Sequence, residues 1–226
     1  MDLTSPPLTT VTVVDALVAA VRARILDGDL PPGTVLAEVR VARDYRVSRP
    51  TAKAALRQLV EQGLLRHDPH HPARVPALAA VDITDLFQIR TPLELVAIEQ
   101  VAPRVAQRAG SLRGMVVAVH ELRELDTEAT HSQFVAADLR FHRELVDLAG
   151  SSRLSRIYAG LQGEIHLCMV QTRVALGRER IVHEHARILH ALQQGDAVSA
   201  GDLMRAHLDG ARAALLARFG GPGAGR

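Results

Sequence analysis

The stretch VSRPTAKAALRQLVEQGLL, residues 47–65, decides the fold of the N-terminal third of this chain. Ser48 is a good helix N-cap, because its hydroxyl can accept a hydrogen bond from a free backbone N–H of the first turn. Apolar residues then recur at steps of three and four, and Gly63 supplies the left-handed residue that often ends a helix. The stretch therefore predicts a short amphipathic helix between Ser48 and Gly63.

Two further helices precede this one. Residues 13–26 show the same apolar periodicity, and after a Pro-Gly turn at residues 30–33 a second short helix is expected over residues 35–44. Two short helices joined by a tight turn form a helix-turn-helix. Beyond Gly63, short extended runs flank a Pro-rich turn at residues 67–72, which predicts a β-hairpin, the wing of a winged helix.

The positive charge of the chain is concentrated in this region. Residues 1–78 hold ten basic and eight acidic groups, whereas residues 79–226 hold seventeen of each. Between Arg40 and Arg57 there are six basic residues against Asp44 alone. The nearly equal numbers of basic and acidic residues in the whole chain argue against a general polyanion binder. The concentration of basic residues between Arg40 and Arg57 favours a single basic surface.

The second helix of a helix-turn-helix lies in the DNA major groove, where its first residues meet the base edges. Arg49 can donate two hydrogen bonds to one guanine, and Lys53, one turn later, can reach a guanine or a phosphate. The hydroxyls of Ser48 and Thr51 can bond phosphate oxygens. The candidate DNA-binding residues of the helices are Arg40, Ser48, Arg49, Thr51 and Lys53. The alternative is that they are solvated charges on a surface helix.

The rest of the chain predicts an all-α bundle of six or seven helices. A capping box at Thr91-Pro92-Leu93-Glu94 predicts a helix start, after a separate short helix from Thr84, and Pro103 is expected to kink or divide the helix that follows. Further helices are expected over residues 112–128, 133–149, 153–175, 178–194 and 197–219. The predicted domains are residues 1–77 and 78–219, with a disordered tail at 220–226.

Four ionisable residues interrupt the apolar stripes of these helices. Asp138 and His142 share one inward face, and His185 and His207 lie within the stripes of the last two helices. A buried carboxylate needs a partner, and a divalent cation held by these four residues would supply it. A hydrogen-bonded network without metal is the alternative.

Other polar residues of the bundle have weaker signals. His183 and His190 fall on the polar side of their helix and are expected in solvent. His166 sits one position off an apolar stripe, where it would either support a metal ligand from outside or line a pocket. Arg90 would meet an anionic effector or form a structural ion pair with Glu94.

Residues 13–76 resemble the winged helix of GntR-type bacterial repressors, chiefly in Leu30-Pro31-Pro32-Gly33 and in the run 47–65. The resemblance implies that Arg40, Arg49 and Lys53 touch operator DNA. The family usually has Arg at the position of Lys53. Lysine cannot form the two parallel hydrogen bonds that a guanidinium forms. The usual Gly pair of the wing is replaced, and the residues there that would approach the minor groove or a phosphate are His70, His71 and Arg74.

Residues 82–216 resemble the ligand-binding FCD domain of the FadR subfamily, through the segments 138–142, 185–196 and 204–208. The resemblance implies that Asp138, His142, His185 and His207 hold a divalent metal, with zinc expected first and nickel or manganese as alternatives. It also implies open coordination sites for the carboxylate of a small effector, with Arg90 and His166 as candidate effector-binding residues.

The sequence as a whole predicts a mainly α, ligand-responsive transcriptional repressor that binds double-stranded operator DNA as a homodimer. A metal-dependent hydrolase is an alternative, but no second carboxylate lies on the stripes that carry Asp138. A metal-free helical interaction module would leave the basic helix unexplained. The single Cys168 excludes an internal disulfide, and the lack of a long apolar run or signal peptide predicts a cytoplasmic protein without membrane contact.

Overall fold

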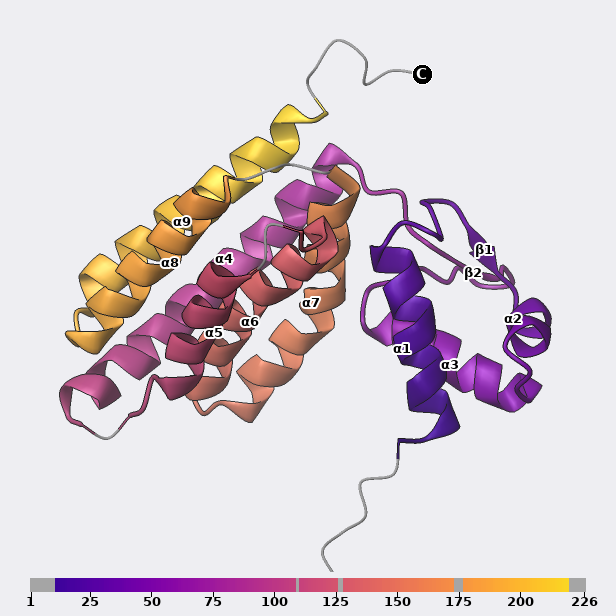
Figure 1. Cartoon of the computed structure of the whole chain (residues 1–226), viewed down its shortest axis with the longest axis horizontal. Coiled ribbons are helices and arrows are strands. Elements are labelled where there is room, and N and C mark those ends of the chain that lie inside the picture. Colours follow the sequence, from indigo (N-terminus) through magenta and orange to yellow (C-terminus); the bar gives the residue numbers. More distant parts are fainter. Residues whose placement is uncertain (1–10, 109, 126–127, 173–176, 220–226) are drawn as a thin grey trace, which may run out of the picture. The chain divides into compact units, whose positions relative to one another are not determined.

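A computed structural model describes residues 11–108, 110–125, 128–172 and 177–219 of the chain (Figure 1). The chain divides into two compact units, Met1–Pro76 and Ala77–Arg226, and each buries apolar side chains of its own. The predicted disordered tail at 220–226 lies outside the described residues.

The N-terminal unit is a winged helix-turn-helix, as the sequence predicts. Its described elements are α1 (Val13–Leu26), β1 (Val35–Leu36), α2 (Glu38–Asp44), α3 (Arg49–Glu61) and β2 (Ala73–Arg74). Ser48 caps α3, and its Oγ accepts a hydrogen bond from the Thr51 N–H at 3.2 Å. The α1 and α3 helices pack together, and Val21 on α1 and Leu59 on α3 are fully buried, while the face of α3 that carries Arg49 and Lys53 is exposed.

The expected start of the second helix at Val35 is wrong. Val35–Leu36 forms β1, which pairs antiparallel with β2 so that Val35 faces Arg74 and Leu36 faces Ala73. Leu36 is buried while Val35 is exposed, the alternation of a strand that covers a core with one face. The expected wing hairpin is reduced to one bridge, in which Arg66 and Arg74 exchange two backbone hydrogen bonds of 2.9 Å.

The C-terminal unit is all-α, and its described residues form six helices (Figure 1). They are α4 (Ala80–Ala106), α5 (Arg113–Glu124), α6 (His131–Leu148), α7 (Ser152–Thr172), α8 (Arg178–Gln193) and α9 (Ala197–Ala217). The α4 helix packs along α9 and also against α6, while α8 packs against α9. One continuous core joins them, and it includes Phe141, Tyr158, Leu192 and Met204.

The predicted helix boundary at Thr91-Pro92 is also wrong. The α4 helix runs without interruption for 27 residues, and both Pro92 and Pro103 lie inside it. A proline in a helix interior costs about 3 kcal/mol, because it removes one hydrogen bond and crowds the preceding turn. The buried face of α4 continues on both sides of Pro92, from Phe87 to Ile98, and burial over this length outweighs that local cost.

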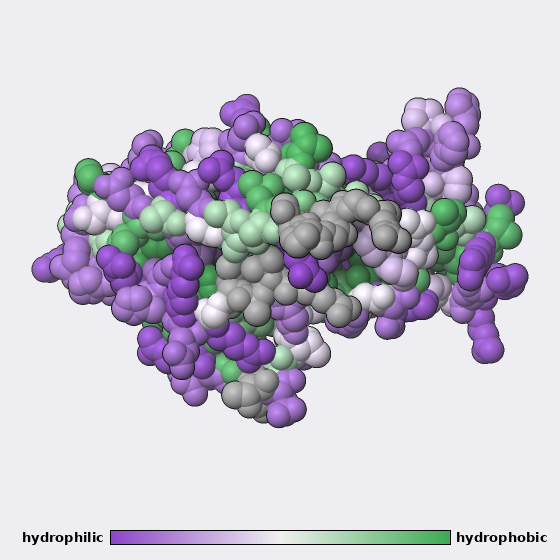
Figure 2. All heavy atoms as spheres, turned by 90° about the horizontal axis from the view of Figure 1, so that it is seen from above, coloured by the Kyte–Doolittle hydropathy of each residue, from purple (hydrophilic) through white to green (hydrophobic). Residues whose placement is uncertain are grey.

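Within the described residues, none of the helices has the length and apolar character that crossing a membrane requires. The face of the molecule drawn in Figure 2 is mostly hydrophilic, with smaller hydrophobic areas among the polar side chains.

Candidate metal centre and DNA-binding surface

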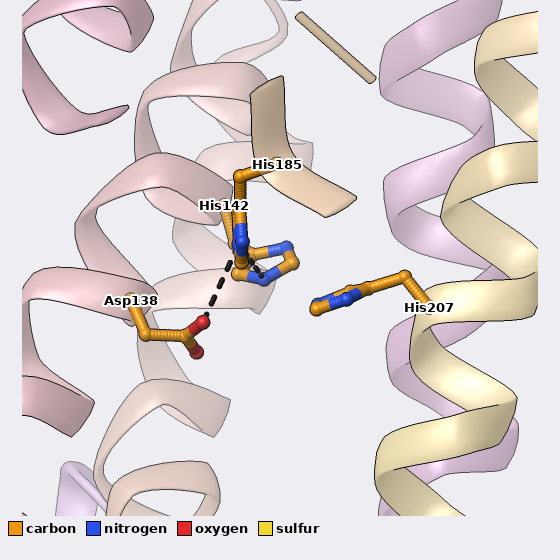
Figure 3. Close-up of side chains that lie close together, drawn as sticks. All are labelled: Asp138, His142, His185 and His207. Atoms are coloured by element: carbon orange, nitrogen blue, oxygen red, sulfur yellow. Dashed lines mark hydrogen bonds and ion pairs between the residues drawn. The ribbon is translucent and has the colours of Figure 1, made fainter. Parts of the chain in front are cut away.

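Three helices of the C-terminal unit bring four ionisable side chains together. Asp138 and His142 lie one turn apart on α6, and His185 on α8 and His207 on α9 point toward them (Figure 3). One ligand atom from each residue lies within 4.8 Å of the others, and all four side chains are buried. The four residues that the sequence singles out are therefore neighbours in space.

The hydrogen bonds of the three imidazoles determine which nitrogen of each ring faces the centre. The Nδ1 atom of His142 donates to Glu94 Oε2 at 2.6 Å, and that of His185 donates to the Ile181 carbonyl at 2.7 Å. His207 Nδ1 donates to Glu184 Oε2 at 2.8 Å. Because these acceptors have no proton to give, each neutral ring carries its hydrogen on Nδ1 and presents the lone pair of Nε2.

These lone pairs face one another. The Nε2 atoms of His142 and His185 are 3.2 Å apart, and His185 Nε2 is 3.4 Å from Asp138 Oδ1 (Figure 3). That oxygen is buried and accepts no hydrogen bond from the described residues. Lone pairs at this separation repel one another unless a proton or a cation lies between them, so the cluster could hold a metal ion.

Burial sets the protonation of the cluster. It lowers the pKa of His142 and lowers the pKa of His185 to about 3, so both rings are neutral near pH 7. Burial alone would raise the pKa of Asp138, but attraction to the neighbouring basic groups outweighs it and keeps the pKa low. An ionised carboxylate beside neutral imidazoles is the protonation state that metal coordination requires.

Glu94 is the partner of His142 that sequence reasoning missed. It is fully buried, and besides His142 it accepts hydrogen bonds from Arg90 Nε at 2.6 Å and Tyr158 OH at 2.7 Å. Burial opposes its ionisation, but Arg90 and His142 hold the pKa of Glu94 well below its usual range. The sequence indicated the Arg90–Glu94 pair, but its contacts with α6 and α7 depend on how the helices pack.

Glu184 is a second missed partner. It lies on α8, and its carboxylate accepts hydrogen bonds from His207 on α9 and from Arg180 Nε at 2.6 Å. The hydrogen bond from His207 is the main reason that the pKa of Glu184 falls to about 2. The sequence shows no second carboxylate on the stripes that carry Asp138, yet Glu94 and Glu184 each accept a hydrogen bond from one of these rings.

The guanidinium of Arg90 is only partly used in hydrogen bonds to the described residues. Its Nε is held by Glu94, but its Nη2, also buried, has no hydrogen-bond partner among the described residues. His166 is half-buried on α7 and is not one of the four clustered residues. His183 and His190 are exposed on α8.

The candidate DNA-binding residues of the N-terminal unit lie on and before α3. Arg40, Arg49 and Lys53 are exposed, and Arg40 forms a 3.5 Å ion pair with Asp44. Ser48 Oγ lies 2.7 Å from Thr51 Oγ1 in addition to capping the helix. The two hydroxyls therefore already bond each other at the start of α3.

The three candidate wing residues lie on the turn before β2 and on β2 itself. His70 has a positive φ of 63°, and His71 Nδ1 donates to the Pro69 carbonyl at 3.0 Å. Arg74 forms a 2.7 Å ion pair with Asp68. These contacts stabilise the turn and leave His70 and His71 exposed.

Comparison with known families matches both units. Residues 14–75 match the family described as "Bacterial regulatory proteins, gntR family", and residues 85–210 match the FCD domain. The second match alone covers more than half of the chain. It spans all four clustered residues and both glutamates.

Individual proteins match over most of their length. The chain is 30% identical over 87% of its length to the "Probable D-xylose utilization operon transcriptional repressor" of Paenarthrobacter nicotinovorans, covering 85% of that protein. It is 26% identical to the HTH-type transcriptional regulator YdhC of Bacillus subtilis, over 82% of this chain and 83% of that one. A solved structure of a transcriptional regulator GntR from Rhodococcus sp. RHA1 is 25% identical, with a TM-score of 0.76 over 90% of this chain and 97% of that one.

Proposed function

Because the chain belongs to the GntR family of bacterial regulatory proteins and carries an FCD domain, we propose that it is a metal-containing repressor whose operator affinity responds to a small carboxylate. The family consists of DNA-binding transcriptional regulators rather than enzymes, so the hydrolase alternative is set aside. The relative from Paenarthrobacter is named a repressor, which supports repression as the mode of action.

The DNA-binding part of the proposal rests on the exposed start of α3. Arg49 and Lys53 read base edges in the major groove, while Ser48, Thr51 and Arg40 position the helix on phosphates. His70, His71 and Arg74 of the wing approach the neighbouring minor groove or its phosphates. An operator with two-fold symmetry needs two such helices, so the proposed active form is a homodimer joined through the helical unit.

The metal part rests on one observation, the close approach of three buried imidazoles to an Asp138 oxygen that accepts no hydrogen bond from the described residues. Asp138, His142, His185 and His207 would hold the ion. Imidazole with a single carboxylate suits zinc, and nickel or manganese are the other candidates. Four protein ligands leave room in an expanded coordination shell for a carboxylate or a water.

The effector part rests on Arg90. Its buried Nη2 has no partner in the part of the chain that the structure describes, and a guanidinium of this kind can donate a charge-assisted hydrogen bond to a carboxylate. We propose that the carboxylate of the effector binds both the metal ion and Arg90, and that His166 on α7 is a further contact to the effector. Such an effector alters DNA binding if it favours one arrangement of the two units over another, because the operator selects among the same arrangements.

Metal analysis of the purified, untagged protein tests the site directly. We expect about one tightly held metal ion per chain in the wild type and none in the double variant His142→Ala, His185→Ala. An apo wild type, even after incubation with zinc, nickel or manganese, would show that the four side chains form only a polar network. Both proteins should keep their helical content by circular dichroism.

A pair of single variants tests whether the two sites are separate. Lys53→Ala should weaken binding to an operator selected from a random duplex library and keep its metal. His207→Ala should lose metal and retain binding to non-specific duplex. Loss of metal from the Lys53→Ala protein would contradict the assignment of the two activities to separate units.

A further inference from the structure

The proposed metal site is flanked by two chains of hydrogen bonds with the same construction. In each chain, a glutamate uses one oxygen for an arginine four residues earlier in its helix and the other oxygen for Nδ1 of a proposed metal ligand. The two chains are Arg90–Glu94–His142 and Arg180–Glu184–His207. The function proposed so far uses the arginine of the first chain and gives that of the second no role.

The two chains differ in their access to water. The side chain of Glu94 is fully buried, whereas that of Glu184 is 22% exposed. The third ring, that of His185, is held by the carbonyl of Ile181, which is also a buried residue. Among the partners of the three rings that the structure describes, Glu184 is therefore the one that reaches solvent.

This position of Glu184 matters for the exchange of a metal ion with the solution. Stripping a cation of its water is strongly unfavourable unless polar groups replace the water, so an ion crosses a protein where such groups lie. The pKa of Glu184 is about 2, chiefly because of the hydrogen bond from His207, so this carboxylate is ionised near pH 7. Figure 3 shows His207 approaching the cluster from α9, on the other side from Asp138. An ion that arrives at Glu184 thus meets His207 first.

The side chain of Arg180 covers this approach. Arg180 lies on α8, but its Nη2 reaches so far that a Cβ built at Gly210 on α9 would be 2.8 Å from it. Gly210 follows His207 by three residues, about one turn of the helix. The Nε of Arg180 also occupies the Glu184 oxygen that His207 does not use. The guanidinium therefore bridges the seam between α8 and α9 beside the proposed site.

We propose that the Arg180–Glu184 pair is the gate through which a metal ion enters and leaves the proposed site. When Arg180 swings away, Glu184 Oε1 becomes free to act as the first protein ligand for an incoming divalent cation, and His207 is the next ligand inward. Because both partners are partly exposed, the pair is weak and opens readily. The inference rests on the proposed metal site and adds a control over the rate of metal exchange that is separate from affinity.

The kinetics of zinc exchange test the gate. Uptake is measured by mixing metal-free protein with zinc and trapping the free ion with a chromogenic chelator after set delays, and release by mixing zinc-loaded protein with excess chelator. Arg180→Gln should speed uptake and release by the same factor, up to about fivefold, because this factor corresponds to the most that an exposed ion pair typically contributes. The Kd for zinc should stay as in the wild type.

Gly210→Ala acts on the same gate without removing a charge. Its new methyl group displaces the flexible end of Arg180 from α9, and alanine is more favourable than glycine inside a helix. This variant should therefore fold as the wild type does and should speed uptake and release as Arg180→Gln does.

Arg140→Gln is the matched control. Arg140 is also an exposed arginine that bridges two helices, because it lies on α6 and pairs with Glu121 on α5 at 2.9 Å. Its partner is not one of the carboxylates that hold the rings. The variant should take up and release zinc at the wild-type rates.

Glu184→Gln separates a role in entry from a role in holding His207. As the first ligand, Glu184 attracts the cation by its charge, so the amide should slow uptake on the order of tenfold. A carboxylate that only holds the ring would affect release and leave uptake unchanged, and that result would overturn the proposal.

The arginine and glycine variants give the remaining decisive results. Wild-type rates of exchange in both Arg180→Gln and Gly210→Ala would overturn the gate and leave the proposed metal site standing. Faster release with unchanged uptake would also overturn it, because Arg180 would then only position Glu184. A wild-type protein that takes up no zinc would overturn both the gate and the proposed site.

Discussion

At the scale of single residues, a substitution of Glu184 tests whether this carboxylate holds the imidazole of His207 in position for the proposed metal. Its carboxylate holds Nδ1 of His207, and such outer partners of a metal ligand typically contribute 10- to 100-fold to metal affinity. We expect Glu184→Gln to weaken zinc binding by about this factor, measured by competition with a chromogenic chelator. Glu184 is partly exposed, so the substitution should leave the fold intact.

Glu179→Gln is the control for that experiment, because Glu179 lies on the same helix and is exposed. It should bind zinc as the wild type does. Equal affinity in the Glu184→Gln and wild-type proteins would mean that His207 is held by packing alone.

The buried histidines also predict how the stability of the metal-free protein depends on pH. His185 has a pKa of about 3 in the folded protein, against about 6.5 in an unfolded chain. Between these values the unfolded chain binds a proton that the folded protein does not, so stability falls as pH decreases from about 6.5 toward 3. Urea denaturation of the metal-free protein at several pH values should show this loss.

The variant His185→Gln should lose part of that dependence, because it removes the titrating ring. If wild type and variant lost stability in parallel over this range, the acid sensitivity would come from other groups.

At the scale of elements, Gly195 decides how closely the α8–α9 turn approaches α4. Its φ is +70°, and a Cβ built there would lie 2.6 Å from the Cβ of Ala106 and 3.2 Å from its Cα. Gly195→Ala therefore combines backbone strain with overlap against the end of another helix. We expect a loss of about 2–4 kcal/mol in the free energy of unfolding, measured by urea denaturation.

Gly150→Ala is the matched control, because Gly150 has nearly the same φ of +72° but meets only the end of the Arg104 side chain, at 3.0 Å. It should cost about 1–2 kcal/mol, the backbone term alone. Equal losses in the two variants would mean that α4 moves away from the new methyl group without a penalty.

Helix identity was more predictable than helix boundaries. Apolar periodicity predicted the helices of the bundle within a few residues, and Ser48 marked the start of α3 correctly. The capping box at Thr91-Pro92 was misleading, because its local preference is weaker than the burial of α4 against α6 and α9. Val35 and Leu36 were misplaced because their partner, β2, lies far along the sequence.

At the scale of the whole molecule, bound metal should stabilise the helical unit. The four proposed ligands come from three helices, so they are neighbours only in the folded state, and an ion that binds only this state raises stability by mass action. Adding zinc at about 100 times its Kd to the metal-free protein should contribute about 2.7 kcal/mol and raise the Tm. Differential scanning calorimetry measures the shift.

The His207→Ala variant should show little or no such increase with zinc. A similar rise in Tm for this variant would indicate that zinc acts elsewhere on the chain.

The sequence by itself determined the two-part character of the chain, because helix periodicity, caps and the basic run at residues 40–57 are local properties that short segments carry. It also singled out Asp138, His142, His185 and His207, because charged residues within apolar stripes stand out wherever the helices end up. Only the tertiary structure decided that Glu94 and Glu184 hold the rings of His142 and His207. These relationships join residues on different elements, and packing, which acts across long stretches of chain, fixes their distances and directions.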